Sequence, residues 1–424
     1  MPSPSDETAP DDATSFARAI SLAALLGAAG AVVALAFVAI VSAGQGVLWP
    51  DQLDPSAFSG SIKILIAMTA GGLAVGVIHT IAPSGAEENV FVALATGQID
   101  AKAVPGGIAI AAVSLIAGFS LGPEVPTGMA AAGLASFAVS RGLVRRRDSE
   151  VAIGAAISGA WGGLFTAPFT ALLLNLELTV ERRTLRWARI AADATAAIVG
   201  FAIFFAVDAG WSNVLGLLEL PPFDFGVPEL ALAVGLGVLG SIIGTVFKIS
   251  MVATRKLAAP LASRPVLRCT ALGLVLGLVG MALPLTLFLG TDGLVDVTSD
   301  PAALGAGLIL VSALVKILAT TGALSFGFVG GPIFPLLFVG GSFGTVIHLA
   351  IDGIPLGLAV VAMMVAVPSS VIPVPLSIAT LTVLIAGVPP SESTSVFVAA
   401  IVAMIAGRLI ETMLPKPAEA TAEQ

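Results

Sequence analysis

Apolar stretches follow one another along almost the whole chain and leave room for only short polar connections. They cover roughly 19–48, 62–82, 104–120, 125–140, 150–164, 168–180, 187–207, 228–254, 266–290, 302–322, 332–351, 355–367, 372–387 and 394–413. A helix that crosses a bilayer needs about 20 mostly apolar residues. Several stretches reach this length, while others are shorter and are interrupted by Gly and Pro. The pattern predicts an all-α integral membrane protein with many tilted and discontinuous helices.

The composition supports this class and excludes others. Only 11% of the 424 residues are charged, whereas a soluble domain carries about 25%. The net charge of −8 lacks the basic footprint of a nucleic-acid-binding protein. One cysteine and two histidines allow neither an internal disulfide nor a His/Cys metal cluster. We therefore expect no cofactor, no metal and no nucleic-acid partner.

The basic residues are concentrated in three short connections. Twelve of the 19 Lys and Arg residues lie there: Arg141, Arg145, Arg146, Arg147, Arg182, Arg183, Arg186, Arg189, Arg255, Lys256, Arg264 and Arg268. The positive-inside rule places these connections in the cytoplasm, and the acidic connections near 51–54, 208–229 and 292–300 outside. Trp49, Trp161, Trp187 and Trp211 lie mostly at the ends of apolar stretches, where interface anchors are expected. The chain is thus predicted to be a multi-pass protein of the cell membrane.

The two halves of the chain echo each other. Pro168 and Pro375 open similar apolar segments 207 residues apart, and the same offset carries Gly122–Pro126 onto residues 329–333, which overlap the Gly/Pro-rich run from Gly330 to Pro335. Matching helix breaks in two halves are typical of transporters whose site lies between repeats. The predicted organisation is a disordered acidic tail (1–14), two membrane repeats (15–207 and 228–413), an external connection (208–227) and a polar tail (414–424).

Glu124 is the most informative residue, because it lies between two apolar stretches and far from any basic connection. A carboxylate inside the membrane is costly and usually functional. Glu124 also opens a predicted helix, with Pro126 in its first turn, and a helix N-terminus binds anions. The carboxylate is therefore expected to occupy an anion site from which a competing anion displaces it. The structural alternative is that Glu124 only caps its helix.

A second Gly/Pro break runs from Gly330 to Pro335 and opens another apolar helix. Its glycines permit close approach of the backbone. The N–H groups of Ile333 and Phe334 are therefore candidates for contacting an anion. Taken alone, the run could also be an ordinary helix break.

Taken together, these elements resemble the CLC family of chloride channels and chloride/proton antiporters. The run Gly122-Pro-Glu-Val-Pro126 is similar to the family's Gly-Lys/Arg-Glu-Gly-Pro element, and Gly331–Pro335 is similar to its Gly-x-Phe-x-Pro element, with the aromatic residue displaced to Phe334. Ser84, Gly85 and Glu88 match its Gly-Ser-Gly-Ile-Pro-Glu element. The resemblance extends over about 60–413 and includes Lys316 and the acid Glu177.

The resemblance implies a CLC-like inverted repeat and transport of chloride or a similar small anion. It implies Glu124 as the gating residue and Ser84, Gly85, Gly122, Ile333 and Phe334 as anion-binding residues. It also implies a homodimer in the lipid bilayer, with one pore per subunit and protons as a further candidate substrate.

Two departures from the family bear on mechanism. The family's tyrosine ligand has no counterpart, because the chain contains no tyrosine. Leu178 stands where the antiporters have an internal glutamate for protons. Glu124, Glu177 and Glu181 are the candidates for a proton pathway. Because Leu178 cannot carry a proton, the sequence favours channel-like or loosely coupled movement over strict exchange, but both stay open.

Two other classes of function could use a chain with this composition. An intramembrane enzyme would need a nucleophile–base set, a metal motif or an Asp pair, and no such motif occurs in the sequence. A proton-coupled secondary carrier of another small solute is the stronger alternative, because Glu124 would also suit a proton site there.

Overall fold

The computed structural model describes residues 13–50, 53–82, 90–96, 98–179, 187–207 and 216–413, and the regular structure of these residues is helical throughout. In the first half the α-helices are α1 (Ala13–Leu48), α2 (Ile62–Ile81), α3 (Val90–Thr96), α4 (Val104–Ile116), α5 (Glu124–Ser140), α6 (Ser149–Leu164), α7 (Pro168–Thr179) and α8 (Trp187–Val207).

The second half begins with the long helix α9 (Val227–Ala258). It continues with α10 (Pro265–Ala282), α11 (Thr291–Ser299), α12 (Pro301–Leu304), α13 (Ala306–Ser325), α14 (Ile333–Ala350), α15 (Leu356–Val371), α16 (Pro375–Ile385) and α17 (Pro390–Met413). Short 3-10 turns flank three of the helices at Arg146–Asp148, Ala259–Leu261 and Pro284–Thr286. Eight of the described helices are long and apolar enough to cross a membrane, which agrees with the predicted multi-pass class.

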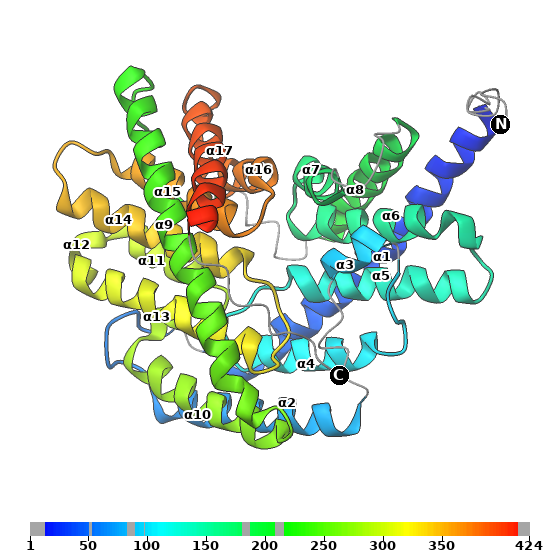
Figure 1. Ribbon diagram of the computed structural model, residues 1–424, viewed down its shortest axis with the longest axis horizontal. Helices are drawn as coiled ribbons and strands as arrows, with labels where there is room; N and C mark the ends of the chain where they lie inside the picture. Colours follow the sequence, from blue (N-terminus) through cyan, green and yellow to red (C-terminus); the bar gives the residue numbers. More distant parts are fainter. Residues whose placement is uncertain are drawn as a thin grey trace.

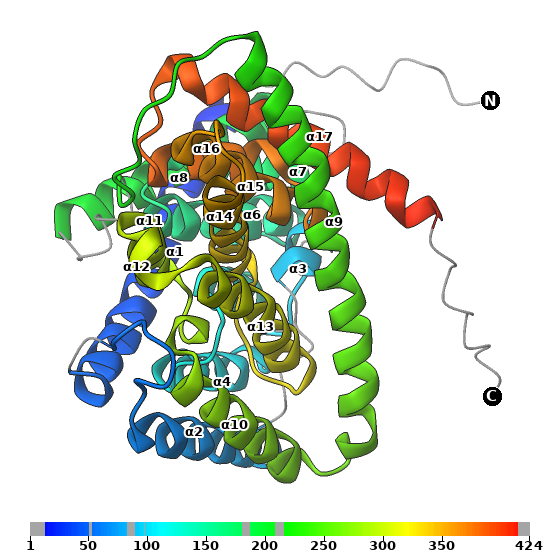
Figure 2. The same cartoon turned by 90° about the vertical axis from the view of Figure 1, so that its left-hand side faces the viewer.

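The helices of the two halves pack in matching order. Helix α1 contacts α6 and α8, as α9 contacts α15 and α17; α5 packs on α6, as α14 packs on α15. Figure 1 shows α1 and α9 as long helices on opposite sides of the molecule, with α7 and α16 facing each other at the top. Helices α2 and α10 lie side by side at the bottom of both views (Figures 1 and 2). This is the arrangement expected of two related halves that meet along a common seam.

Small residues let the helices of the first half cross closely. A Cβ on Gly200 of α8 would lie only 1.9 Å from the carbonyl oxygen of Gly159 in α6. A Cβ on Gly159 would in turn lie 2.2 Å from the carbonyl oxygen of Gly27 in α1. Because lipid tails are as apolar as side chains, close backbone packing is a main source of association between membrane helices. The many glycines of the sequence therefore bring α1, α6 and α8 together.

We expect Gly200→Ala to destabilise the protein, because backbone atoms of α6 leave no room for a methyl group. The loss should be about 1–3 kcal/mol in free energy of unfolding, as for overpacked cores, and thermal unfolding in detergent measures it. Gly235→Ala is the matched control, since a Cβ there meets no atom within 4 Å. Equal stability of the two variants would contradict the close crossing.

The two Gly/Pro breaks interrupt the membrane helices as the sequence predicted. Helix α5 begins at Glu124 after Pro123, and α14 begins at Ile333 after Pro332. The offset of 207 residues that the sequence predicted between these breaks is wrong. Glu124 and Ile333 are 209 residues apart, not 207, so the run Gly122-Pro-Glu-Val-Pro126 corresponds to Gly331-Pro-Ile-Phe-Pro335. The 207-residue offset holds only for the starts of α7 and α16 at Pro168 and Pro375.

Candidate functional site

The two helix breaks meet inside the molecule. Gly122 and Gly331 form an isolated antiparallel bridge, in which the N–H of each donates to the carbonyl oxygen of the other at 2.8 Å. The bridge brings the N-termini of α5 and α14 together. Each N-terminus carries unpaired N–H groups and a partial positive charge, so the pair forms an electropositive centre without a charged side chain.

The side chain of Glu124 lies in this centre. It is 1% exposed, and its Oε1 accepts a hydrogen bond of 2.8 Å from the backbone N–H of Ile333. Its Oε2 is buried and has no hydrogen-bond partner in the described residues. Glu124 therefore does more than cap its own helix, because its carboxylate reaches the N-terminus of α14 in the other half.

Both bridging glycines are needed to make room for this carboxylate. A Cβ on Gly331 would lie 2.0 Å from Cδ and Oε1 of Glu124, and a Cβ on Gly122 would lie 2.0 Å from Oε2. The Gly122 N–H is already bonded to Gly331. Gly122 therefore contributes space beside the carboxylate, while its N–H is engaged in the bridge.

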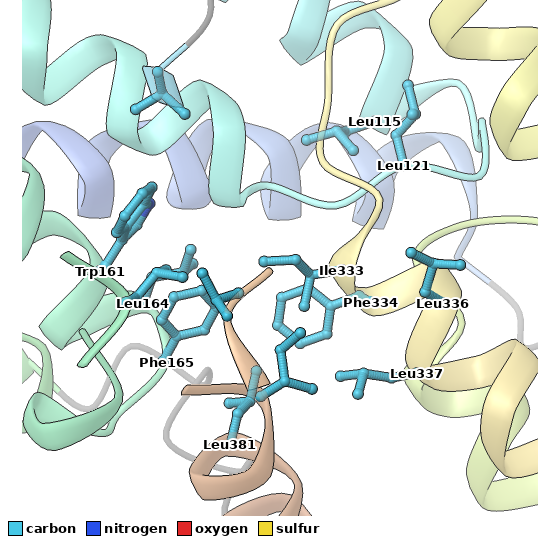
Figure 3. Close-up of a cluster of buried hydrophobic side chains, with 14 of the residues drawn as sticks. Leu115, Leu121, Trp161, Leu164, Phe165, Ile333, Phe334, Leu336, Leu337 and Leu381 are labelled. Atoms are coloured by element: carbon cyan, nitrogen blue, oxygen red, sulfur yellow. The ribbon is translucent and has the colours of Figure 1, made fainter. Parts of the chain in front are cut away.

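Aromatic side chains form one wall of the site. Trp161 Nε1 donates to the backbone oxygen of Glu124 at 2.8 Å. The ring of Phe165 lies 6.1 Å from that of Phe334 and 6.5 Å from that of Trp161, centroid to centroid. Figure 3 shows these rings beside Ile333, with Leu381 of α16 below them.

Trp161 is a further correction, because the sequence placed it at a membrane interface. It is 1% exposed and lies in the core. The apolar stretch that it ends stops inside the protein, at the break between α6 and α7. Trp187, by contrast, is 82% exposed at the start of α8, as an interface anchor should be; Trp211 lies outside the described residues.

The candidate anion ligands Ser84 and Gly85 lie outside the described residues, as does Glu181 of the candidate proton pathway. They stay predictions from the sequence. Of the predicted site residues, Glu124, Gly122, Ile333 and Phe334 come together, and Glu177 lies elsewhere.

Glu177, near the end of α7, binds the N-terminus of α16. Its Oε1 accepts from the N–H of Leu376 at 2.9 Å, and its Oε2 accepts from the N–H of Ser377 at 2.9 Å and from the Ser377 hydroxyl at 2.5 Å. These contacts satisfy donors that the helix itself leaves unpaired. Leu178 is half-buried and packs against the apolar core. Glu177 thus joins the two halves as a helix cap.

Glu177→Ala should lower the free energy of unfolding by about 1–2 kcal/mol, the usual cost of removing an N-terminal cap. Chemical denaturation or thermal melting in detergent measures this. Glu219→Ala, which removes an exposed carboxylate, should change stability by less than about 0.5 kcal/mol. A Glu177→Ala protein as stable as Glu219→Ala would rule out the capping role.

Lys316 is completely buried in α13. Its Nζ donates to the carbonyl oxygens of Leu285, Leu287 and Phe288 at 2.9 to 3.3 Å and lies 4.7 Å from the ring centroid of Phe338. Each contact is to a carbonyl or a ring face, both of which stabilise a cation. Lys316 therefore fixes the segment after α10 against α13 and α14.

The profile of the family described as "Voltage gated chloride channel" matches residues 91–411. The chain belongs to this family. Among its relatives, the putative ion-transport protein YfeO of Salmonella paratyphi A is 28% identical over 355 residues, which cover 80% of this chain and 83% of the relative. The same protein of Salmonella newport gives the same values. Family membership and the eight apolar helices identify a multi-pass membrane protein of anion transport.

Two solved structures share the fold. A slow cyanobacterial Cl⁻/H⁺ antiporter superimposes with a TM-score of 0.78 at 16% identity, covering 93% of this chain and 95% of that one. A CLC-type fluoride/proton antiporter gives a TM-score of 0.74 at 18% identity, covering 93% and 96%. The predicted CLC-like fold is therefore confirmed.

Proposed function

We propose that this protein carries chloride or a similar small anion past the junction of α5 and α14, with Glu124 as the gate. The observation that supports this proposal is that the buried Glu124 carboxylate accepts a hydrogen bond from the N–H of Ile333. A carboxylate and a halide are both anions that accept hydrogen bonds from N–H groups. The site that holds one can therefore hold the other when the carboxylate is protonated or displaced.

The chemistry of the site suits transport rather than tight binding. Backbone N–H groups and helix dipoles attract an anion without a full positive charge nearby. Conduction requires that an ion bind well enough to enter and weakly enough to leave. Ile333 and Phe334 would donate the N–H groups, Gly122 would leave space, and Ser84 and Gly85 would contribute from the segment before α3.

The repeat boundaries are part of the proposal. Residues 15–207 and 228–413 would form the two halves, joined by an external connection at 208–227 and flanked by tails at 1–14 and 414–424. The matching order of helix contacts in α1–α8 and α9–α17 supports this division. The family further suggests a homodimer in the bilayer with one pathway per subunit, which mass measurement in detergent or nanodiscs can test.

We expect proton coupling to be weaker than in an antiporter that has a glutamate directly after the acid matched here by Glu177 of α7. Leu178 holds that position, and Glu177 is engaged with α16. We therefore favour channel-like or loosely coupled anion movement, with Glu124 as the outer proton-binding residue.

The decisive experiment is efflux from liposomes that hold the purified protein, with chloride and pH recorded together. We expect chloride efflux above that of empty liposomes, and slower or no uptake of labelled organic solutes. Proton-driven uptake of an organic solute without chloride flux would favour the alternative, a proton-coupled carrier of another small solute, and would overturn the proposal.

The orientation in the membrane gives a separate prediction. In a Cys269→Ser background, Arg146→Cys and Ser263→Cys should be labelled only from the cytoplasmic side, and Glu219→Cys only from outside. All three positions are exposed, whereas Cys269 is buried. The expectation rests on the clustering of Lys and Arg in the connections. Labelling of either basic connection from outside would contradict it.

A further inference from the structure

Helix α8 carries a buried ion pair that the proposed anion site does not use. Arg189 Nε lies 3.4 Å from Asp193 Oδ2, and the two side chains are 17% and 2% exposed. Arg189, which the sequence analysis placed in a basic connection, lies instead in the first turn of α8, and Asp193 lies one turn further on, at the end of the helix predicted to face the cytoplasm. An ionisable group at membrane depth is a candidate functional residue because burying it is costly.

Asp193 is distinguished by its position. Among the described residues, the buried acidic side chains are Glu124, Asp193 and Glu392. Glu124 occupies the central site, and Glu392 lies in the first turn of α17, near Phe223 of the connection predicted to be external. Among these three, Asp193 is therefore the buried acid on the predicted cytoplasmic side of Glu124. At the position where antiporters have an inner glutamate, this chain has Leu178.

The ion pair packs against a glycine of α6 that also contacts a buried polar side chain of α7. A Cβ on Gly154 of α6 would lie 2.6 Å from Arg189 Nη2 and 3.3 Å from Asp193 Oδ1, so the pair packs directly against this glycine. The buried side chain of Asn175 in α7 donates from Nδ2 to Ser158 Oγ at 2.9 Å and to the Gly154 carbonyl oxygen at 3.4 Å. The amide of Asn175 and the hydroxyl of Ser158 thus interact on the part of α6 whose Gly154 contacts the pair.

One face of α6 connects this cluster with the anion site. Gly154, Ser158 and Trp161 follow at i, i+4 and i+7, so they share one side of the helix. The first of them contacts the ion pair, and Trp161 donates to the backbone oxygen of Glu124. Seven helical residues span about 10 Å. Trp161 bonds to a backbone oxygen, so its role is to hold Glu124 in place.

We propose that Asp193 is the inner proton-binding residue of the transport cycle, in place of the glutamate that antiporters have at the Leu178 position. This inference rests on the proposed function of Glu124. A proton from a cytoplasmic hydronium ion binds an Asp193 carboxylate oxygen and gives a neutral carboxylic acid. The proton then passes to the Glu124 carboxylate along the side of α6 that carries Ser158, and Asp193 regains its negative charge next to Arg189.

The other charged groups near α8 are few. Helix α8 packs on α1, α6 and α7, whose titratable side chains in the described residues are Arg18, Glu150 and Glu177. Arg18 and Glu150 are exposed at the ends of their helices, and Glu177 is bound to α16. Among the charged groups of the described residues, Arg189 is the one that forms an ion pair with Asp193.

The test compares two variants that both lack the ion pair. Arg189→Gln keeps the acid, and Arg189→Gln/Asp193→Asn removes it without leaving an arginine buried alone, which would be destabilising. With a chloride gradient across proteoliposomes and no pH gradient, we expect the double variant to move protons at least about tenfold more slowly than Arg189→Gln, because a proton without titratable groups must cross hydrocarbon as a bare charge. Chloride flux should differ by less than about twofold between the two variants, since the anion site is untouched.

Each outcome decides the question. Equal proton movement in the two variants would reduce the pair to a structural link between α6 and α8, and so would a wild-type protein that moves chloride but no protons. In both cases the proposed anion pathway would stand. If the wild-type protein moved no chloride, the proposed function itself would be wrong. Should the double variant fail to fold, Arg189→Met/Asp193→Leu replaces both charges by apolar side chains, and the same comparison is made with Arg189→Met, which keeps the acid.

Discussion

Glu124→Gln is expected to leave chloride flux intact and to abolish its dependence on pH. In the wild-type protein the carboxylate competes with the anion for the N–H of Ile333. Protonation weakens that competition, so flux should rise as the pH falls. The neutral amide keeps the size of the side chain and removes its titration. Flux of the variant should therefore change by less than about twofold between about pH 5 and about pH 8, because an amide does not titrate in this range.

The measurement is chloride efflux from proteoliposomes at a series of pH values, with proton movement recorded in parallel. Proton movement should disappear in Glu124→Gln, because the outer proton-binding residue is lost. Asp300→Asn is the matched control: Asp300 is exposed and its carboxylate caps α12, far along the chain from the anion site. If wild-type flux were independent of pH and Glu124→Gln left it unchanged, Glu124 would be a structural link between α5 and α14.

The breaks at the site could be predicted from the sequence because Gly and Pro act locally. Gly122 and Gly331 are followed by Pro residues that cannot continue a preceding helix, so α5 and α14 begin where the residues indicate. Which residues of the two breaks pair with each other was harder to predict. Connections of different length separate the elements of each half, so a single offset cannot align all of them.

Tertiary placement decided the roles of Trp161 and Glu177. Both lie at the ends of apolar stretches, and the sequence cannot distinguish an end at the lipid interface from an end inside the protein. Trp161 ends its stretch beside the anion site, and Glu177 meets the N-terminus of α16, almost 200 residues further along the chain. Contacts between halves of this kind require knowledge of how the halves pack.

Asp193 shows the same limit. Arg and Asp four residues apart after a basic connection are typical of a solvated helix face, and nothing local marks them as buried. Their burial depends on Gly154, which lets α8 approach α6 at that level. Spacing along α6 then relates the pair to Glu124. The role of Asp193 can therefore be inferred only once the packing of α6 against α8 is known.

Gly331→Ala should open the same gate without altering the carboxylate itself. The added methyl group would lie 2.0 Å from Cδ and Oε1 of Glu124. The end of a glutamate side chain can rotate away, whereas the bridge to Gly122 holds the backbone. The carboxylate should therefore leave the N–H of Ile333 while the protein keeps its fold. A hydrogen bond to a charged group contributes about 1.5–3 kcal/mol, so chloride flux at neutral pH should rise by about tenfold.

A double-mutant cycle separates this effect from a general disturbance of the backbone. In a Glu124→Ala background there is no carboxylate to displace, and Gly331→Ala should then change chloride flux by less than about twofold. Gly322→Ala, where a Cβ meets only Leu272 at 3.5 Å, is the control for adding a methyl group to a buried glycine. If Gly331→Ala altered flux equally in both backgrounds, its action would not pass through Glu124. Occupation of the α14 N-terminus by that carboxylate would then have no part in gating, although the bridge between the two halves would still form the centre of the fold.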